Sequence, residues 1–277
     1  MKISIVTDST CDIPYETADA CSISIVPNLL VVDGKSIEDG KDFSRQGFYE
    51  RLPGMRTFPT TASPSLAAFA EAYVRCFDQG ADAIISIQVS QKLSAVHNTA
   101  SLAAQSFDGR VHVFDSQNVS LGLGFQALAA AEAASAGLPL ESVLARLEDI
   151  RRRVHLVAML DTLEYVRRSG RVSWARASLG AFLNIKPFVE VRGGQVYSLG
   201  ETRTRRKGIA RLLELIEDLG ALERLAILHS NAEGDARQLA EIFAPRLPRP
   251  PFVVNVTTVI GAHVGPNGLG FAAVVAP

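Results

Sequence analysis

The sequence predicts an α/β protein of two domains: an N-terminal Rossmann-like domain with a parallel sheet and a smaller C-terminal α+β domain with a mixed or antiparallel sheet. In the first half, short apolar runs alternate with longer helical patterns, which is typical of a parallel sheet covered by helices. In the second half, a two-residue glycine signal indicates an antiparallel hairpin. The length of 277 residues, at about 150 residues per domain, allows one or two domains.

Three short segments of the first half are predicted to be buried parallel strands. They span Ile3–Thr7, Ala83–Ile87 and Val111–Phe114, are rich in β-branched residues, and each stops at a polar turn. Between them, Ser63 followed by Pro64 resembles a helix N-cap with proline at the first helical position. Apolar residues then recur at helical spacing up to Gly80, and 92–106 and 119–136 are two further Ala-rich helical segments.

The second half is predicted to begin at residue 154, which divides the chain into domains 1–153 and 154–277. Gly193-Gly194 lies between the strand candidates Ile185–Val191 and Gln195–Leu199 and is typical of a tight hairpin. The arginine run Arg151–Arg153 is interpreted as a solvated helix end. The other predicted elements are strands Val154–Leu160, Leu225–His229, Phe252–Val256 and Phe271–Val275, and helices Leu163–Ser169, Arg205–Leu219 and Glu233–Phe243.

The composition excludes several classes of protein. Hydrophobic residues make up 47% of the chain, and 28 Lys and Arg oppose 29 Asp and Glu. A disordered or fibrous chain is excluded, and no global charge indicates a nucleic-acid partner. No membrane span or export signal is expected, and three cysteines without C-x-x-C spacing favour a cytoplasmic protein.

Small hydroxylated and acidic residues gather where the predicted parallel strands end. Asp8, Ser94 and Asp115 follow three of these strands, and Thr61 lies in a separate loop rich in hydroxyl groups. Ligands of open parallel sheets bind beyond the carboxyl ends of the strands, where hydroxyls and helix-end amides form a cradle for an anion. Each residue alone is equally consistent with a cap or a turn.

His263 differs from the other four histidines because it lies in the glycine-rich stretch 261–270, predicted to be a loop that approaches a ligand. No histidine or cysteine spacing indicates a metal, and neither a G-x-G-x-x-G order nor a Walker lysine indicates a nucleotide cofactor. Arg171 closes an arginine-rich segment around Gly170. With Lys186 and the basic run 203–207, it predicts a face that handles anions.

Six short motifs occur in the order seen in the DegV family, which this chain resembles from residue 3 to about 275. They are Thr7–Pro14, Pro59–Ser65, Asp115-Ser116 with Ser120–Gly122, Leu160–Arg171, Ile185–Pro187 and Gly261–Pro266. The resemblance implies two domains with a long-chain fatty acid between them. It also implies the role of a fatty-acid-binding subunit of bacterial fatty acid kinase, which presents the acid to a separate kinase subunit and holds the acyl phosphate for phospholipid synthesis.

The same resemblance implies the site residues. Thr61 and Ser94 would hydrogen-bond the carboxylate, and Arg171 and His263 would compensate the negative charge that phosphate adds. The protein would have no catalytic activity and no cofactor of its own, and a transient membrane contact is left open. Ile25, Phe125, Phe182 and Leu183 are candidates for lining the acyl chain, although ordinary core is the interpretation favoured for each of them.

The chain departs from the family at one motif. Relatives commonly read L-S-G-T-Y-Q-S-A, whereas residues 93–100 read Leu-Ser-Ala-Val-His-Asn-Thr-Ala and keep the serine, Ser94. Two other functions stay open. One is an enzyme acting on a small phosphorylated or carboxylated substrate, with His263 as acid or base and Asp8 or Asp115 assisting. The other is a binding module for a different amphiphile, such as a retinoid or acyl-CoA.

Overall fold

A computed structural model describes residues 1–41, 44–172 and 185–277 of the chain. These residues form two compact units, each described here by itself. Unit 1 comprises residues 1–29, 62–153 and 193–195, and unit 2 comprises residues 30–61, 154–192 and 196–277.

Unit 1 is built on a four-stranded parallel sheet. Its strand order is β2 (Ile23–Val26), β1 (Ile3–Asp8), β6 (Ala83–Gln88) and β7 (Val111–Asp115), and every neighbouring pair is parallel. The three strands predicted from apolar runs are therefore confirmed. All six side chains of β6 are buried, as expected of a central strand covered on both faces.

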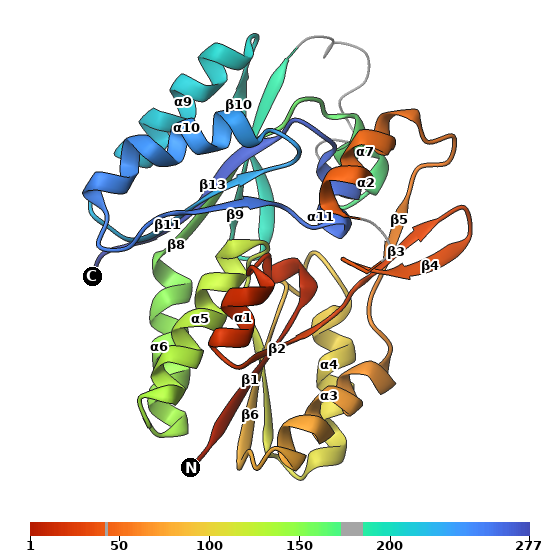
Figure 1. Cartoon of the computed structure of the whole chain (residues 1–277), viewed down its shortest axis with the longest axis vertical. Helices are drawn as coiled ribbons and strands as arrows, with labels where there is room; N and C mark the ends of the chain where they lie inside the picture. Colours follow the sequence, from red (N-terminus) through yellow and green to blue (C-terminus); the bar gives the residue numbers. More distant parts are fainter. Residues whose placement is uncertain (42–43, 173–184) are drawn as a thin grey trace. The chain divides into compact units, whose positions relative to one another are not determined.

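Helices cover both faces of this sheet. α5 (Leu121–Ser135) and α6 (Leu140–Arg153) lie on one side, and α3 (Leu66–Asp78) and α4 (Val96–Ala104) on the other (Figure 1). α5 is buried almost all round because it lies between the sheet and α6, which explains why its Ala- and Gly-rich sequence has no polar face. The unit also contains α1 (Tyr15–Ala20) and the short 3-10 turns η1 (Ser9–Cys11) and η3 (Gln105–Phe107).

Two predicted helix starts are wrong. α3 is capped by Ser65, whose Oγ accepts the amide hydrogen of Ala68 at 3.1 Å, so Ser63 and Pro64 lie outside the helix. Ser65 has the extended backbone of an N-cap, and the local pattern did not distinguish two serines placed two residues apart. α4 begins at Val96 instead of residue 92, which leaves Ser94 in the preceding turn.

Unit 2 contains a six-stranded mixed sheet, as predicted. Its order is β10 (Gln195–Thr202), β9 (Lys186–Arg192), β8 (Val154–Met159), β13 (Leu269–Val275), β11 (Leu222–His229) and β12 (Phe252–Asn255). β11 and β12 are parallel, whereas β13 runs antiparallel to both β8 and β11. Gly193 and Gly194 have φ values of 54° and 81°, the left-handed backbone that a tight hairpin requires.

The two faces of this sheet carry different layers. α9 (Arg205–Glu217) and α10 (Glu233–Phe243) pack over one face, on a core that includes Phe188 and Phe271. α2 (Arg45–Arg51), α7 (Glu164–Ser169) and α11 (Thr258–Val264) gather on the other side of the sheet (Figure 1). The turns η2 (Leu52–Gly54) and η4 (Ala244–Arg246) complete the helical elements described.

Residues 30–61 belong with the C-terminal residues, in contrast to the predicted contiguous boundaries of 1–153 and 154–277. They include α2 and most of a three-stranded sheet of order β4 (Lys35–Glu38), β3 (Leu29–Val32) and β5 (Thr60–Ala62). Buried Tyr49 of α2 donates its hydroxyl hydrogen to the carbonyl of Val256 at 3.0 Å, and Thr258 donates to Asp39 at 2.7 Å. Local patterning does not indicate a partner some 200 residues away, so the sequence could not place this segment.

The arginine run at the end of α6 is a helix end, but only part of it is solvated. Arg152 exposes 69% of its side chain, whereas Arg151 and Arg153 expose 23% and 13%. Arg151 pairs with Glu148 and also donates to the carbonyl of Asp115 at the end of β7. Within the described ranges, no helix is both long and apolar enough to cross a bilayer.

Candidate functional site

The glycines around His263 serve helix packing. Gly261 lies on α11 and Gly265 follows the helix as its C-cap, and a Cβ atom at Gly261 would lie 2.5 Å from the hydroxyl oxygen of Tyr49. A Cβ atom at Gly265 would lie 2.3 Å from the ring of Tyr165, and its φ of +77° ends the helix. The two glycines let α11 pack closely against α2 and α7. The segment predicted to be a loop is therefore a helix as far as residue 264, and it is irregular only from Gly265 to Gly268.

This packing brings two of the predicted site residues into contact. The hydroxyl of Thr61 on β5 lies 2.8 Å from Nε2 of His263 in the last turn of α11. Nδ1 of His263 is buried, and no hydrogen-bond partner for it exists among the described residues. The pair therefore presents a hydroxyl group and a second ring nitrogen, each able to bind a further polar atom.

The imidazole of His263 is neutral at pH 7. Burial, together with the smaller effect of the nearby positive charge of Arg171, lowers its pKa to about 4. Arg171 follows α7, where its amide donates to Oγ of Ser169, and its side chain is exposed. Sequence reasoning assigned a positive charge to both Arg171 and His263. With a neutral imidazole only Arg171 carries one, because a buried imidazole near a guanidinium does not take up a second proton.

Ser94 lies in unit 1, in the turn before α4. Its Oγ accepts the amide hydrogen of Val96 at 3.4 Å, and its amide donates to the carbonyl of Ser90. The serine lies one residue before the N-cap Ala95 and is half-buried, and its contribution to a carboxylate site stays a prediction. Among the candidate lining residues, Phe125 is fully buried and Ile25 is half-buried. Phe182 and Leu183 lie outside the described residues.

Asp8 and Asp115, the carboxylates of the enzyme hypothesis, both accept hydrogen bonds from residues of nearby loops. Asp8 is fully buried at the end of β1 and accepts hydrogen bonds from Thr10, Asn28 and the amide of Val89. Burial raises its pKa, and these hydrogen bonds oppose the rise. Oδ1 of Asp115 accepts from the amide of Gln117 in its own loop and from the amide of Gln91 in the loop after β6. These bonds involve both carboxylate oxygens of Asp8 and Oδ1 of Asp115.

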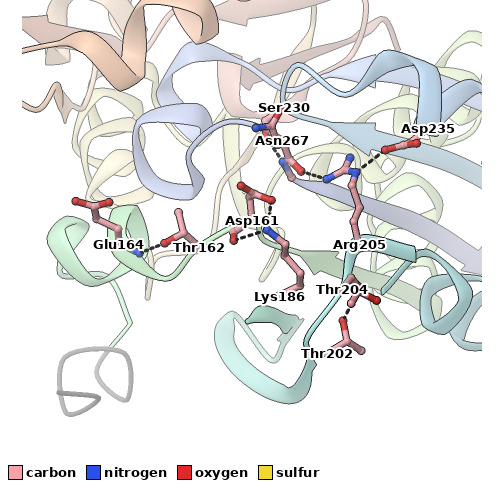
Figure 2. Close-up of polar contacts among 11 residues, drawn as sticks. Asp161, Thr162, Glu164, Lys186, Thr202, Thr204, Arg205, Ser230, Asp235 and Asn267 are labelled. Carbon is pink, nitrogen blue, oxygen red and sulfur yellow. Dashed lines mark hydrogen bonds and ion pairs between the residues drawn. The ribbon is translucent and has the colours of Figure 1, made fainter. Parts of the chain in front are cut away.

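Three cations of the predicted anion-handling face form ion pairs. Lys186 lies 2.5 Å from Asp161, and Arg205 lies 2.6 Å from Asp235 (Figure 2). Arg168 pairs with Glu164 at 2.6 Å and stacks over the ring of Phe58. Sequence reasoning missed these acidic partners because they come from other elements of the fold or from the opposite end of the same short helix.

Sequence reasoning also missed Tyr49 and Tyr165, against which the two glycines pack. One signal was present: two glycines at positions i and i+4 are a spacing typical of close helix packing. Reading this spacing as a helix would have predicted α11. It would not have identified the tyrosines, which lie far away in the sequence.

The family model described as "Uncharacterised protein, DegV family" matches residues 2–276. A DegV domain-containing protein of Streptomyces coelicolor is 36% identical, with 97% of this chain and 96% of the relative covered. Protein DegV of Bacillus subtilis is 31% identical, with 98% of both covered.

Solved structures of fatty-acid-binding proteins share the fold. A DegV family protein of Thermus thermophilus, described by its fatty acid binding, matches with a TM-score of 0.92 at 33% identity over 100% of both chains. DegV of Bacillus subtilis, described as a fatty acid binding protein, matches with a TM-score of 0.88 at 30% identity over 100% of both chains. On its match over nearly the whole length, the chain belongs to the DegV family.

Proposed function

We propose that this protein binds one long-chain fatty acid and presents its carboxylate to a separate fatty acid kinase. It then holds the acyl phosphate for phospholipid synthesis and has no catalytic activity of its own. The observation that carries the proposal is the Thr61–His263 contact beside Arg171, in a fold shared with DegV proteins described as binding fatty acids. A cytoplasmic location is part of the same proposal.

The chemistry of the three residues suits a carboxylate that must stay reactive. A neutral imidazole that donates from Nε2 to the oxygen of Thr61 leaves the threonine hydrogen for a carboxylate oxygen. Such a neutral donor binds the acid without a buried ion pair, so one carboxylate oxygen stays available for phosphorylation. The exposed charge of Arg171 then compensates the charge that phosphate adds.

The acyl chain would supply most of the affinity. Burial contributes about 0.8 kcal/mol per methylene, so a C16 chain supplies roughly 10 kcal/mol before the cost of association. The head-group residues would then determine orientation more than binding strength. The predicted placement of the acyl chain between the two domains, with Ser94 on the carboxylate, stays a prediction.

Mass spectrometry of organic extracts from the purified protein tests fatty-acid binding. We expect a stoichiometric C14 to C18 fatty acid in the wild type and its depletion in a Thr61→Ala, Ser94→Ala double variant. Replacing exposed Thr60 by Ala is the matched control and should leave the ligand in place. A wild type that is empty and also takes up no added oleate or palmitate overturns the proposal.

The kinase step has a separate test. The loaded protein is mixed with a bacterial fatty acid kinase catalytic subunit and ATP, and acyl phosphate is trapped with hydroxylamine as the hydroxamate. Hydroxamate that requires both proteins supports the presenting role. Hydroxamate formed by this protein alone with ATP contradicts the absence of catalysis, and none from a mixture with an active kinase contradicts the partnership.

A further inference from the structure

The segment after His263 is held by an interlocking set of hydrogen bonds in unit 2. The amide of Asn267 donates to the carbonyl of Ser230 at 2.5 Å, and the amide of Gly268 donates to Oγ of Ser230 at 2.7 Å. The amide of Ser230 in turn donates to the carbonyl of Gly268. One further contact comes from α9: Nη1 of Arg205 donates to the carbonyl of Asn267 at 2.7 Å (Figure 2).

Arg205 is itself oriented by a carboxylate. Its Nε lies 2.6 Å from Oδ2 of Asp235 in the first turn of α10, and the two side chains expose 30% and 32% of their surface. The planar guanidinium thus binds Asp235 with one nitrogen and Asn267 with another, a fork that lysine lacks. Figure 2 shows the three residues in line, from Asp235 through Arg205 to Asn267.

The location of Arg205 runs against local preference. It is the first residue of α9, after the N-cap Thr204, where the partial positive charge of the helix disfavours a cation. A residue type that is unfavourable at its position in a helix often has a role in a tertiary contact. Here the charge is compensated by Asp235, and the contact that results is the one to Asn267.

The connection from Asn267 back to His263 is short and constrained. Three residues separate them, and among these Gly265 turns at φ +77° against the ring of Tyr165. A shift of the Asn267 carbonyl would therefore be transmitted to the last turn of α11, where His263 meets Thr61 at 2.8 Å. At hydrogen-bond length, a displacement of a few tenths of an ångström decides whether that contact forms.

We propose that Arg205 and Asp235 are positioning residues of the candidate site: by fixing the carbonyl of Asn267, they hold His263 in contact with Thr61. The consequence for ligand affinity rests on the proposed fatty-acid binding. The effect on the His263 ring exists without any ligand, so the two can fail separately.

The experiment compares Arg205→Ala, Arg205→Lys and Asp235→Asn with the wild type of the full chain. Long-range ¹H–¹⁵N spectra of the ligand-free protein report the tautomer and line width of His263, and displacement of a fluorescent fatty acid by oleate gives the affinity. Arg211→Ala is the matched control, because it removes an exposed arginine of the same helix that pairs with Glu214 one turn away. Circular dichroism and thermal unfolding confirm that each variant is folded.

We expect a single His263 tautomer in the wild type and in Arg211→Ala. In Arg205→Ala and Asp235→Asn we expect averaged or broadened resonances and an oleate affinity reduced about fivefold. The oleate affinity of Arg205→Lys should lie between those of the wild type and Arg205→Ala, since lysine can keep one of the two contacts. The double variant Arg205→Ala, Asp235→Asn should be no worse than Arg205→Ala, because the two residues act as one unit.

Two results separate the proposals. Folded variants whose His263 resonances and oleate affinity match the wild type overturn the positioning role. If the wild type binds no oleate while the His263 resonances change as expected, fatty-acid binding fails and the positioning role stands.

Discussion

The hydroxyl of Thr61 lies 2.8 Å from Nε2 of His263 across 202 residues of sequence. Both side chains belong to unit 2, because residues 30–61 pack with the C-terminal residues. The contact couples the orientation of the threonine hydroxyl to the tautomer of a histidine that burial and Arg171 keep neutral. This pair is the basis of the first two predictions.

Replacing Thr61 by Val should weaken fatty-acid binding about fivefold to tenfold, because the valine keeps the shape but loses one hydrogen bond worth about 1 kcal/mol. Displacement of a fluorescent fatty acid by palmitate measures the change. Thr60→Val alters an exposed neighbour on the same strand and should match the wild type. Equal affinity of Thr61→Val and Thr60→Val would remove Thr61 from the carboxylate site.

The neutral His263 should make stability fall in mild acid. Its pKa is about 4 in the folded protein against 6.5 in the unfolded chain, so below pH 6.5 the unfolded state binds the extra proton. The stabilisation, about 3 kcal/mol at most, is complete above pH 6.5 and is lost as pH falls through 4. Urea unfolding of the wild type and His263→Gln between pH 4 and pH 7.5 measures it.

The informative quantity in that experiment is the difference between the two proteins. Burial also lowers the pKa of His155 and of His229, so part of the slope is shared by the variant. We expect the stability difference between wild type and His263→Gln to shrink towards acid pH. A difference independent of pH would mean that His263 is ionised normally in the fold.

Gly265→Ala should destabilise unit 2 by about 3 kcal/mol or more, because a left-handed backbone and a clash combine at this position. The added Cβ would lie 2.3 Å from the ring of Tyr165 at a φ of +77°. Gly220→Ala is a close control, with a φ of +76° and no atom within 4 Å of the added Cβ. It should cost only about 1 to 2 kcal/mol. Chemical denaturation measures both, and equal losses would contradict the packing role of Gly265.

Asp8→Asn should destabilise unit 1 by about 2 to 4 kcal/mol, because the substitution leaves buried donors facing each other. One carboxylate oxygen accepts from Asn28 and Thr10 and the other from the amide of Val89, so an amide nitrogen meets a donor in either orientation. Asp33→Asn, at an exposed turn, serves as the control. A stable Asp8→Asn protein would contradict this structural role of Asp8.

The sequence predicted those features that depend on neighbouring residues. The strands of unit 1 and the hairpin at Gly193-Gly194 follow from β-branched runs and from glycine's access to positive φ. The six motifs in order identified the family, and the family model over residues 2–276 confirms it. The same motifs singled out Thr61 and His263, which the fold brings into contact.

Only the tertiary structure decided which distant elements meet. It assigned residues 30–61 to unit 2 through buried contacts such as Tyr49 with Val256, and it paired Arg205 and Lys186 with acids from other elements. It also made His263 neutral, since a pKa depends on burial and on charges brought near by folding. Local sequence sets backbone preference and side-chain chemistry, whereas desolvation and charge pairing arise between residues far apart in the chain, where no short-range pattern reports them.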